Sequence, residues 1–327
     1  MKNLQKILDD TSIIKVTKEA SQYKVKILSP QVGSYIDLRE FTTNWPEECL
    51  YELARLKGEW FYDSYQRFEH PNYVQKQVDF ILDFHRISLI NKRILDFGCG
   101  FGASSYCLIK RGANHIIATE LDDNNIKFAR KFFYTMGYSK FVEIREGNIV
   151  PTLEPNSFDI IWLQAVVEHL LPEERKEYLN KFWHALNPKG FLIITEVPNR
   201  IWPIELHTTG GKWFIPWMRP EKAFQLIKKN YHKFESYTET DFYRSGIIGS
   251  SYKEILRCLE YPSDLTDLSI KHKNYLKHLY SYARNKSFSK KIIINILNLF
   301  EPLALYIPRR PITAFMPFLN HLAFQKN

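Results

Sequence analysis

The 327-residue sequence lacks any long hydrophobic run. Its best candidate, residues 292–307, is interrupted by Asn295, Asn298 and Glu301, whereas a helix that spans a bilayer needs about 20 largely apolar residues in a row. The first ten residues, MKNLQKILDD, lack the apolar segment of a secretory signal. We therefore expect a soluble, cytoplasmic protein without a transmembrane segment.

Cysteine is also scarce. The four cysteines, at positions 49, 99, 107 and 258, form no CxxC pair and have no zinc-like spacing with histidines. This pattern excludes a disulfide framework and a structural zinc site of the usual kind. Glu205 and His207 lie close together in the sequence but have no convincing third ligand, so we predict no bound metal.

Acidic residues are fewer than basic ones. The sequence has 36 Asp and Glu and 45 Lys and Arg, which gives a net charge of +9. A dense basic block is absent, and the most concentrated basic stretch is residues 271–291. Charge runs of this kind are usually solvated helix faces. The net charge also leaves open a nucleic acid, an anionic membrane surface or an acidic small substrate as a partner.

What the sequence does contain is a regular alternation of strands and helices from Arg93 to about residue 197. Short apolar strands that alternate with helices are typical of a parallel sheet covered on both faces. We predict an α/β fold with a doubly wound, mostly parallel, Rossmann-like sheet. The predicted strands are residues 93–97, 115–121, 141–148, 158–166 and 191–197, and the predicted helices are 103–112, 122–137 and 172–186, with a turn at 187–190.

The flanking regions suggest three parts. Residues 1–90 form an N-terminal cap, with a strand at 23–28 and helices that run from Pro46 to Gly58 and onward from Pro71. Residues 91–245 form the core, with a lid loop at 198–220, a helix at 220–230 and a strand near 232–239. Residues 246–327 are mainly helical, and LAFQKN at 322–327 forms a final edge strand.

A glycine-rich turn follows the first strand of the core. Gly98, Gly100 and Gly102 stand at alternate positions between a strand and a helix, where glycine permits positive φ and the close approach of a ligand. With Ala103 and Glu120 the turn also satisfies the dinucleotide fingerprint G-x-G-x-x-G/A.

Asp96 separates the two interpretations of this turn. A carboxylate two residues before the first glycine would repel a pyrophosphate at the helix N-terminus. The same carboxylate suits a ligand that carries an ammonium group. The turn therefore favours a cationic nucleoside over a dinucleotide, and an NAD-dependent oxidoreductase becomes the weaker hypothesis.

The segment ILDFGCGFG resembles the first motif of class I S-adenosylmethionine-dependent methyltransferases, and the resemblance covers residues 93–199. ATELDDNNIKFAR, EGNI, FDIIWLQAVVEHLLPEE and LNPKGFLIITEVPN resemble the later motifs in order. The motif set is similar to that of small-molecule enzymes of the ubiquinone-biosynthesis type. The resemblance implies S-adenosyl-L-methionine as the cofactor, which itself supplies the activated methyl group.

The resemblance also implies roles for single residues. Asp96 and the backbone of the glycine turn would hold the methionine end of the cofactor, and Glu120 would accept hydrogen bonds from the ribose hydroxyls. Asn148, where the family usually has an aspartate, would bracket the adenine together with Ile149. Gln164, at the end of the fourth strand, would face the methionine moiety or the acceptor.

An oxygen acceptor generally needs a base, and histidine is the usual one near neutral pH. His169, after the fourth strand, and His207, in the loop after the fifth, are the candidates. A structural role in the loop remains open for each. The aromatic residues Trp202, Trp213, Phe214 and Trp217 either line an acceptor pocket or pack as a lid.

These observations favour a methyltransferase that acts on a small molecule, with O-methylation ahead of N- or C-methylation. A sugar, a quinone-like lipid or a secondary metabolite would fit. RNA methylation and a non-catalytic cofactor-binding subunit are the alternatives. The sequence shows no RNA-binding module, leaves peripheral membrane contact open, and does not predict the oligomeric state.

Overall fold

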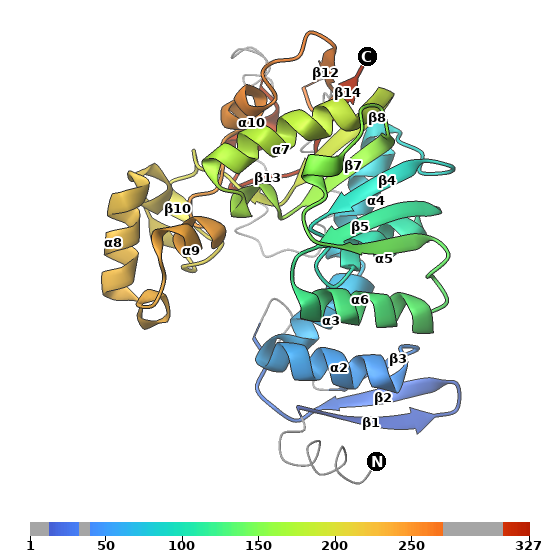
Figure 1. The fold of residues 1–327 in the computed structure, drawn as a ribbon. Helices are drawn as coiled ribbons and strands as arrows, with labels where there is room; N and C mark the ends of the chain where they lie inside the picture. Colours follow the sequence, from blue (N-terminus) through green and yellow to red (C-terminus); the bar gives the residue numbers. More distant parts are fainter. Residues whose placement is uncertain (1–12, 33–39, 271–309) are drawn as a thin grey trace. The chain divides into compact units, whose positions relative to one another are not determined.

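The structure is a computed structural model that describes residues 13–32, 40–270 and 310–327 (Figure 1). The chain divides into two compact units. The first holds the described residues up to Val78 together with Cys99–Gly147, and the second holds Asp79–Gly98 and the described residues from Asn148 onward. The division falls inside the glycine turn, between Gly98 and Cys99.

The first unit begins with a small antiparallel sheet in the order β1-β2-β3. Its strands are β1 (Ile14–Glu19), β2 (Gln22–Ile27) and β3 (Glu40–Thr43). Helix α2 (Glu47–Lys57) has Pro46 as its N-cap and Gly58 as its C-cap, as the sequence predicts. Helix α3 (Phe61–Glu69) follows. Helix α4 (Val74–His85), of which only residues 74–78 belong to this unit, begins three residues after the predicted Pro71, because residues 71–73 form a turn.

An aromatic cluster holds the helices of the first unit together. The Trp45 ring lies 4.9 Å from that of Phe68 and 4.5 Å from that of Phe132, between ring centroids, and its indole N–H donates to Glu69 at 2.8 Å. Trp45 is 1% exposed. Large aromatic side chains contribute the most apolar area to such contacts.

The first unit also contains α5 (Ala103–Lys110), β5 (His115–Glu120), α6 (Asp123–Thr135) and β6 (Val142–Glu146).

The chain forms one seven-stranded main sheet. Its strands β5 and β6 belong to the first unit, and the other strands belong to the second unit. Strands β4 (Arg93–Phe97), β7 (Phe158–Gln164) and β8 (Leu186–Thr195) pair in parallel. The seven-stranded sheet has the order β12-β14-β8-β7-β4-β5-β6, and β5 and β6 pair in parallel as well. The prediction of an α/β fold with a mostly parallel, Rossmann-like sheet is confirmed.

Strand β7 is apolar on both faces, since Ile160, Ile161, Trp162 and Leu163 are each at most 1% exposed. A strand covered on both sides reads as a continuous apolar run. Helix α7 (Pro172–Ala185) lies along the β7 and β8 side of this sheet (Figure 1). Its start at Pro172 agrees with the sequence, because proline is favoured in the first helical turn.

Two local predictions are wrong. The predicted turn at 187–190 is part of β8, which starts directly after α7. The pairing of β8 with β7 contains a register shift at this point, between Phe158 and Ile160 of β7. The predicted strand near 232–239 is a 3₁₀ turn, His232–Phe234, followed by the capping box of α9 (Glu239–Arg244) at Thr238. The local hydrogen bonds of Thr238 and Asp241 favour a helix start over an extended strand.

Of the C-terminal region that the sequence predicts to be mainly helical, the structure describes residues 246–270 and 310–327. These residues contain α10 (Tyr252–Cys258), β12 (Leu265–Asp267), a 3₁₀ turn at Ile312–Phe315 and β14 (Leu322–Lys326). Strand β14 forms as predicted but pairs antiparallel with both β8 and β12, so β12, not β14, is the edge. The basic stretch at 271–291 lies outside the described residues.

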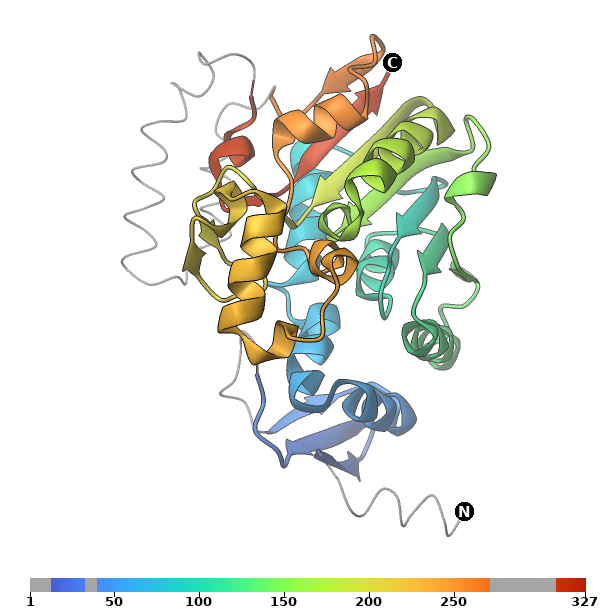
Figure 2. The ribbon, with the colours of Figure 1, turned by 60° about the vertical axis from the view of Figure 1, so that its left-hand side comes forward.

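The predicted lid loop at 198–220 has structure of its own. It contains β9 (Val197–Pro198), the hairpin of β10 (Ile204–Glu205) and β11 (Lys212–Trp213), and a 3₁₀ turn at Ile215–Trp217. Helix α8 (Pro220–Asn230) follows at its predicted bounds. Figure 2 shows the β10–β11 hairpin, α8 and α9 in one lobe, and an apolar cluster fills it: Ile215, Ala223, Ile227, Phe234, Phe242, Ile247 and Ile248.

None of the helices in the described ranges combines the length and hydropathy that crossing a bilayer requires.

Candidate functional site

In the second unit, the glycine turn starts directly after β4. Asp96 is 1% exposed, and its backbone pairs with Trp162 of β7. Gly98 has a φ of 71°, and a Cβ at this position would lie 2.8 Å from Cγ2 of Val166. The turn therefore touches the segment after β7, two residues before Glu168.

The rest of the turn belongs to the first unit. The N–H of Gly100 donates to Oε2 of Glu120 at 2.9 Å. Oε1 of Glu120 accepts from the N–H groups of Leu121 at 2.7 Å and Asp122 at 3.0 Å. Three backbone donors thus fix the carboxylate at the end of β5. A carboxylate offers about four acceptor positions, so Oε2 retains one for a ligand hydroxyl.

Lys57, at the end of α2, is a residue of this turn region that sequence reasoning missed. Its ammonium lies 3.6 Å from the ring centroid of Phe101, within the glycine turn. Burial lowers the pKa of Lys57, and the nearby Asp122 carboxylate opposes this effect. No sequence signal marks Lys57, because it stands more than forty residues before the turn.

Asn148, the predicted adenine contact, is the first residue of the second unit after the division at Gly147. Its amide nitrogen donates to the Tyr178 hydroxyl at 2.6 Å, and its amide oxygen accepts from the N–H of Val150 at 3.0 Å. A carbonyl oxygen has two lone pairs, so this oxygen can accept one further hydrogen bond. The neighbouring Ile149 is half-buried.

Gln164 is the last residue of β7, and both ends of its amide are engaged. Its oxygen accepts from the indole N–H of Trp162 at 3.2 Å, and its nitrogen donates to Glu196 at 3.1 Å. Ala165 and Glu196, which follow β7 and β8, both have positive φ. These bonds orient Gln164 at the carboxyl end of the strand.

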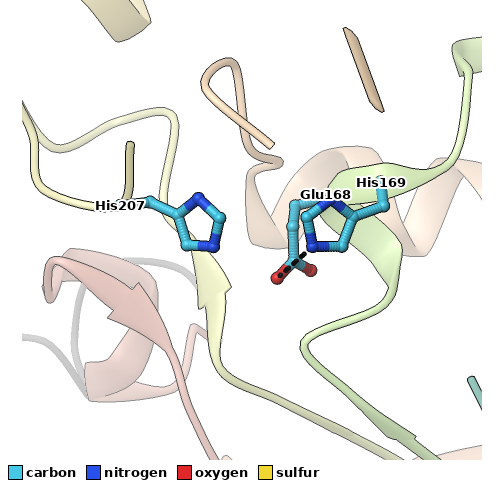
Figure 3. Close-up of side chains that lie close together, drawn as sticks. All are labelled: Glu168, His169 and His207. Carbon is cyan, nitrogen blue, oxygen red and sulfur yellow. Dashed lines mark ion pairs between the residues drawn. The ribbon is translucent and has the colours of Figure 1, made fainter. Parts of the chain in front are cut away.

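Both candidate catalytic histidines lie in one cluster with Glu168. Figure 3 shows the rings of His169 and His207 close together beside the Glu168 carboxylate. The ring centroids are 5.7 Å apart, and Nε2 of His169 is 3.8 Å from Oε1 of Glu168. One ligand atom of each residue lies within 4.8 Å of the others. Sequence reasoning found both histidines but not the part played by Glu168.

Neighbouring residues fix which nitrogen of each ring carries a proton. Nδ1 of His169 lies 2.6 Å from the carbonyl oxygen of Arg244, which can only accept, so Nδ1 donates. Thr208 donates its single hydroxyl proton to the Ser245 carbonyl at 3.0 Å, so its oxygen accepts from Nδ1 of His207 at 2.9 Å. In the neutral form of each ring, Nε2 is therefore the basic nitrogen.

Glu168 is the buried member of this cluster. Its side chain is fully buried, and neither carboxylate oxygen makes a hydrogen bond to another described residue. Burial raises the pKa of Glu168 to about 8, and the charge of Glu196 acts in the same direction. Burial also lowers the pKa of the half-exposed His169. Near neutral pH His169 is therefore a neutral imidazole.

Glu205 is not part of the cluster. Its carboxylate accepts from the backbone N–H groups of His207, Thr208 and Thr209, at 2.8, 2.8 and 2.5 Å. These bonds shape the turn after β10 that carries His207. Glu205 therefore positions His207 through the backbone.

The aromatic residues of the 198–220 segment are mostly exposed. Trp213, Phe214 and Trp217 are 60%, 49% and 57% exposed and contact one another, with ring centroids 5.8 and 5.5 Å apart in sequence order. The small cavity nearby is lined by other residues, such as Ile204, Ile247 and Phe318. The three rings therefore form an exposed patch, and only Trp202 is half-buried.

The raised pKa of Glu168 predicts how stability depends on pH. The ordinary pKa of 4.5 applies in the unfolded chain, and a pKa of about 8 applies in the folded one. Between these values only the unfolded chain loses the proton, so a rise in pH favours unfolding. Urea denaturation of chelator-treated protein should show stability falling from about pH 5 to 8, by up to about 1.4 kcal/mol per pH unit.

Two variants test this assignment. Glu168→Gln cannot ionise and should flatten the pH profile relative to the wild type. Glu173→Gln, which changes an exposed carboxyl in the first turn of α7, should keep the wild-type slope. Parallel profiles for Glu168→Gln and the wild type would mean that Glu168 is ionised in the folded protein.

The fold and the turn define a class of protein. Residues 95–194 match the family described as "Methyltransferase domain". They form an S-adenosylmethionine-dependent class I methyltransferase domain, as the sequence motifs predict.

Curated relatives resemble the chain over part of its length. The ubiquinone biosynthesis O-methyltransferase of Xylella fastidiosa strain M23 is 26% identical over 152 residues, which is 46% of this chain and 57% of that protein. The carboxy-S-adenosyl-L-methionine synthase of Salmonella paratyphi C is 28% identical over 158 residues, 44% of this chain and 62% of that protein. The chain thus spans about 60% of the length of these relatives.

Solved structures resemble the chain only loosely. A putative sarcosine dimethylglycine methyltransferase from Galdieria sulphuraria has a TM-score of 0.44 and 15% identity, and the match covers 77% of this chain and 85% of that one.

Proposed function

We propose that the protein is a methyltransferase that transfers the methyl group of S-adenosylmethionine to an oxygen of a small-molecule acceptor. The observation that carries this proposal is the position of the Glu168–His169–His207 cluster. Glu168 and His169 lie in the turn after β7, and His207 joins them from the turn after β10. Val166, two residues before Glu168, touches the first glycine of the turn. Basic groups therefore stand beside the turn that is characteristic of the methyltransferase domain.

The chemistry is an in-line displacement. An acceptor oxygen attacks the methyl carbon, the bond from carbon to sulfur breaks, and S-adenosylhomocysteine leaves. The acceptor's proton goes to Nε2 of His169 or His207, because Nδ1 of each ring already carries one. Positioning of the two reactants supplies much of the rate enhancement in such a reaction, up to about 7–11 kcal/mol.

The cofactor roles belong to the same proposal. Asp96 and the backbone of the turn hold the methionine end, and Oε2 of Glu120 accepts from a ribose hydroxyl. Asn148 and Ile149 bracket the adenine, and Gln164 orients the methionine moiety or the acceptor. The remaining acceptor position on Glu120 and on Asn148 supports this assignment.

The name of the Xylella relative favours a quinone-like acceptor, and a sugar or another secondary metabolite is compatible with the same chemistry. The cytoplasm is the proposed location. The net charge of +9 keeps an RNA acceptor as the second candidate. RNA binding would fall steeply as salt rises, whereas methylation of a neutral small molecule would not.

Two measurements test the proposal. Isothermal titration with S-adenosylmethionine and with NAD should give binding only for the former. Purified protein with methyl-labelled S-adenosylmethionine should then transfer label to a polyphenol or quinol acceptor and not to RNA. Binding of NAD alone would reject the cofactor, and label transfer to RNA alone would reject the acceptor class.

A further inference from the structure

Glu168, His169 and His207 also have the composition of a metal site. One carboxylate and two imidazoles converge from two separate segments, the turn after β7 and the turn after β10, with their ligand atoms within 4.8 Å of one another. Histidine nitrogen and carboxylate oxygen are the usual ligands of Zn²⁺ and related ions. The sequence paired His207 with Glu205 and found no third ligand. The structure instead pairs it with Glu168 and His169.

The Glu168 carboxylate is a second, independent indication. It is fully buried, and neither oxygen makes a hydrogen bond to the side chain or backbone of another described residue. The charge of Arg175 offsets this burial only in part, since both of its terminal nitrogens donate to backbone carbonyls and not to Glu168. A buried polar group without a partner is costly. A bound cation would supply the missing interaction.

The hydrogen bonds of the imidazoles fit a metal site as well. Metal-bound histidines usually donate their other N–H to a carbonyl, carboxylate or water, which fixes the ring and the basic nitrogen. His169 donates from Nδ1 to the Arg244 carbonyl, and His207 donates from Nδ1 to the Thr208 hydroxyl. Both rings therefore use Nε2 as the ligand nitrogen.

A glycine allows the side chains to come this close. Gly246 has a φ of 76°, and a Cβ there would lie 3.0 Å from both Cγ of Glu168 and Cε1 of His207. Any larger residue would push these two side chains apart. Ser245, its neighbour, holds Thr208 through its carbonyl. The segment at 244–246 thus supports all three members of the cluster.

We propose that Glu168, His169 and His207 bind one divalent transition-metal cation. Two imidazoles favour Zn²⁺ or Co²⁺ over Mg²⁺ and Ca²⁺, which prefer oxygen ligands. Bonds of about 2.0–2.2 Å place tetrahedral ligand atoms about 3.3 Å apart. The widest pair in the cluster, at most 4.8 Å apart, must therefore close by up to about 1.5 Å on binding. The exposed ring of His207 is the member able to make this movement.

Three protein ligands leave a coordination position for another molecule, as in catalytic zinc sites. If the proposed function holds, an acceptor hydroxyl occupies that position. The cation then activates the hydroxyl in place of a histidine base, because Nε2 of both rings is coordinated. It lowers the pKa of the hydroxyl, as it does for bound water, and the hydroxyl proton passes to solvent. This consequence rests on the proposed function, whereas the binding of the cation does not.

Metal binding is tested on tag-free, chelator-treated full-length protein. Titration with Zn²⁺ should give one equivalent bound with a Kd in the micromolar range or below, and Co²⁺ should give the visible spectrum of a site with mixed nitrogen and oxygen ligands. His207→Ala, which changes an exposed side chain, and Glu168→Gln, which keeps the side-chain volume, should each weaken Zn²⁺ binding at least about 30-fold. His184→Ala, at an exposed histidine of α7, should bind Zn²⁺ as the wild type does.

Wild-type Zn²⁺ affinity in both His207→Ala and Glu168→Gln, or no stoichiometric binding to the wild type, would overturn the proposal. Thermal unfolding shows whether each variant is folded. S-adenosylmethionine binding, measured on the same samples, separates the two questions. A protein that binds the cofactor but no Zn²⁺ retains the proposed function without the metal site, and the reverse result retains only the metal site.

Discussion

Replacing Glu120 by glutamine will weaken S-adenosylmethionine binding by about 10- to 100-fold. A hydrogen bond to a charged group contributes about 1.5–3 kcal/mol, and each 1.4 kcal/mol is a factor of ten in affinity. The substitution also places an NH₂ group where the carboxylate now accepts from Gly100, Leu121 and Asp122. One of these donors then faces another donor, so the turn shifts as well. Isothermal titration measures the affinity.

Asp122→Asn is the matched control for Glu120→Gln. It removes a carboxylate two residues away, but asparagine caps a helix as well as aspartate does, and Asp122 caps α6. We expect its cofactor affinity to stay within about twofold of the wild type, a far smaller change than the loss of at least about tenfold expected for Glu120→Gln. If both variants lose affinity equally, the loss reflects the local negative charge, and the ribose assignment of Glu120 is wrong.

Replacing Arg175 by methionine will cost about 2–4 kcal/mol of the free energy of unfolding. Arg175 is 8% exposed, and its guanidinium donates to the carbonyls of Gly249 at 3.0 Å and Leu170 at 3.1 Å. Methionine fills a similar volume but donates nothing, so two carbonyls lose their charged donor. The contact also ties α7 to the segment that follows Gly246. Urea denaturation should show the loss as a lower midpoint.

Lys176→Met, at the next position of α7, is the control. Lys176 forms an ion pair with Glu260 at 3.2 Å, but its side chain is 64% exposed. Exposed ion pairs contribute little, with a median near 0–1 kcal/mol. We expect a change below about 0.5 kcal/mol. Equal losses in the two variants would show that charge on α7, and not the buried contacts of Arg175, sets the stability.

The central sheet was predictable because its signals are local. Apolar runs such as residues 158–164 identify a strand covered on both faces, and Pro46, Gly58 and Pro172 mark helix ends through their backbone preferences. The errors fell where tertiary contacts decide. Residues 187–190 are of types that favour a turn, but they are part of β8, which pairs with β7. Residues 322–326 form a strand as expected, yet their place between β8 and β12 depends on a segment far away in the sequence.

The sequence by itself determined the methyltransferase domain, since the order of Asp96, the three glycines and Glu120 is a pattern along the chain. It also placed His169 and His207 after strands whose ends meet at one edge of a sheet. Only the tertiary structure decided that the two histidines converge on Glu168 and that the Glu205 carboxylate binds backbone N–H groups instead. Burial and convergence are properties of packing between residues some forty positions apart. No spacing in the sequence encodes them.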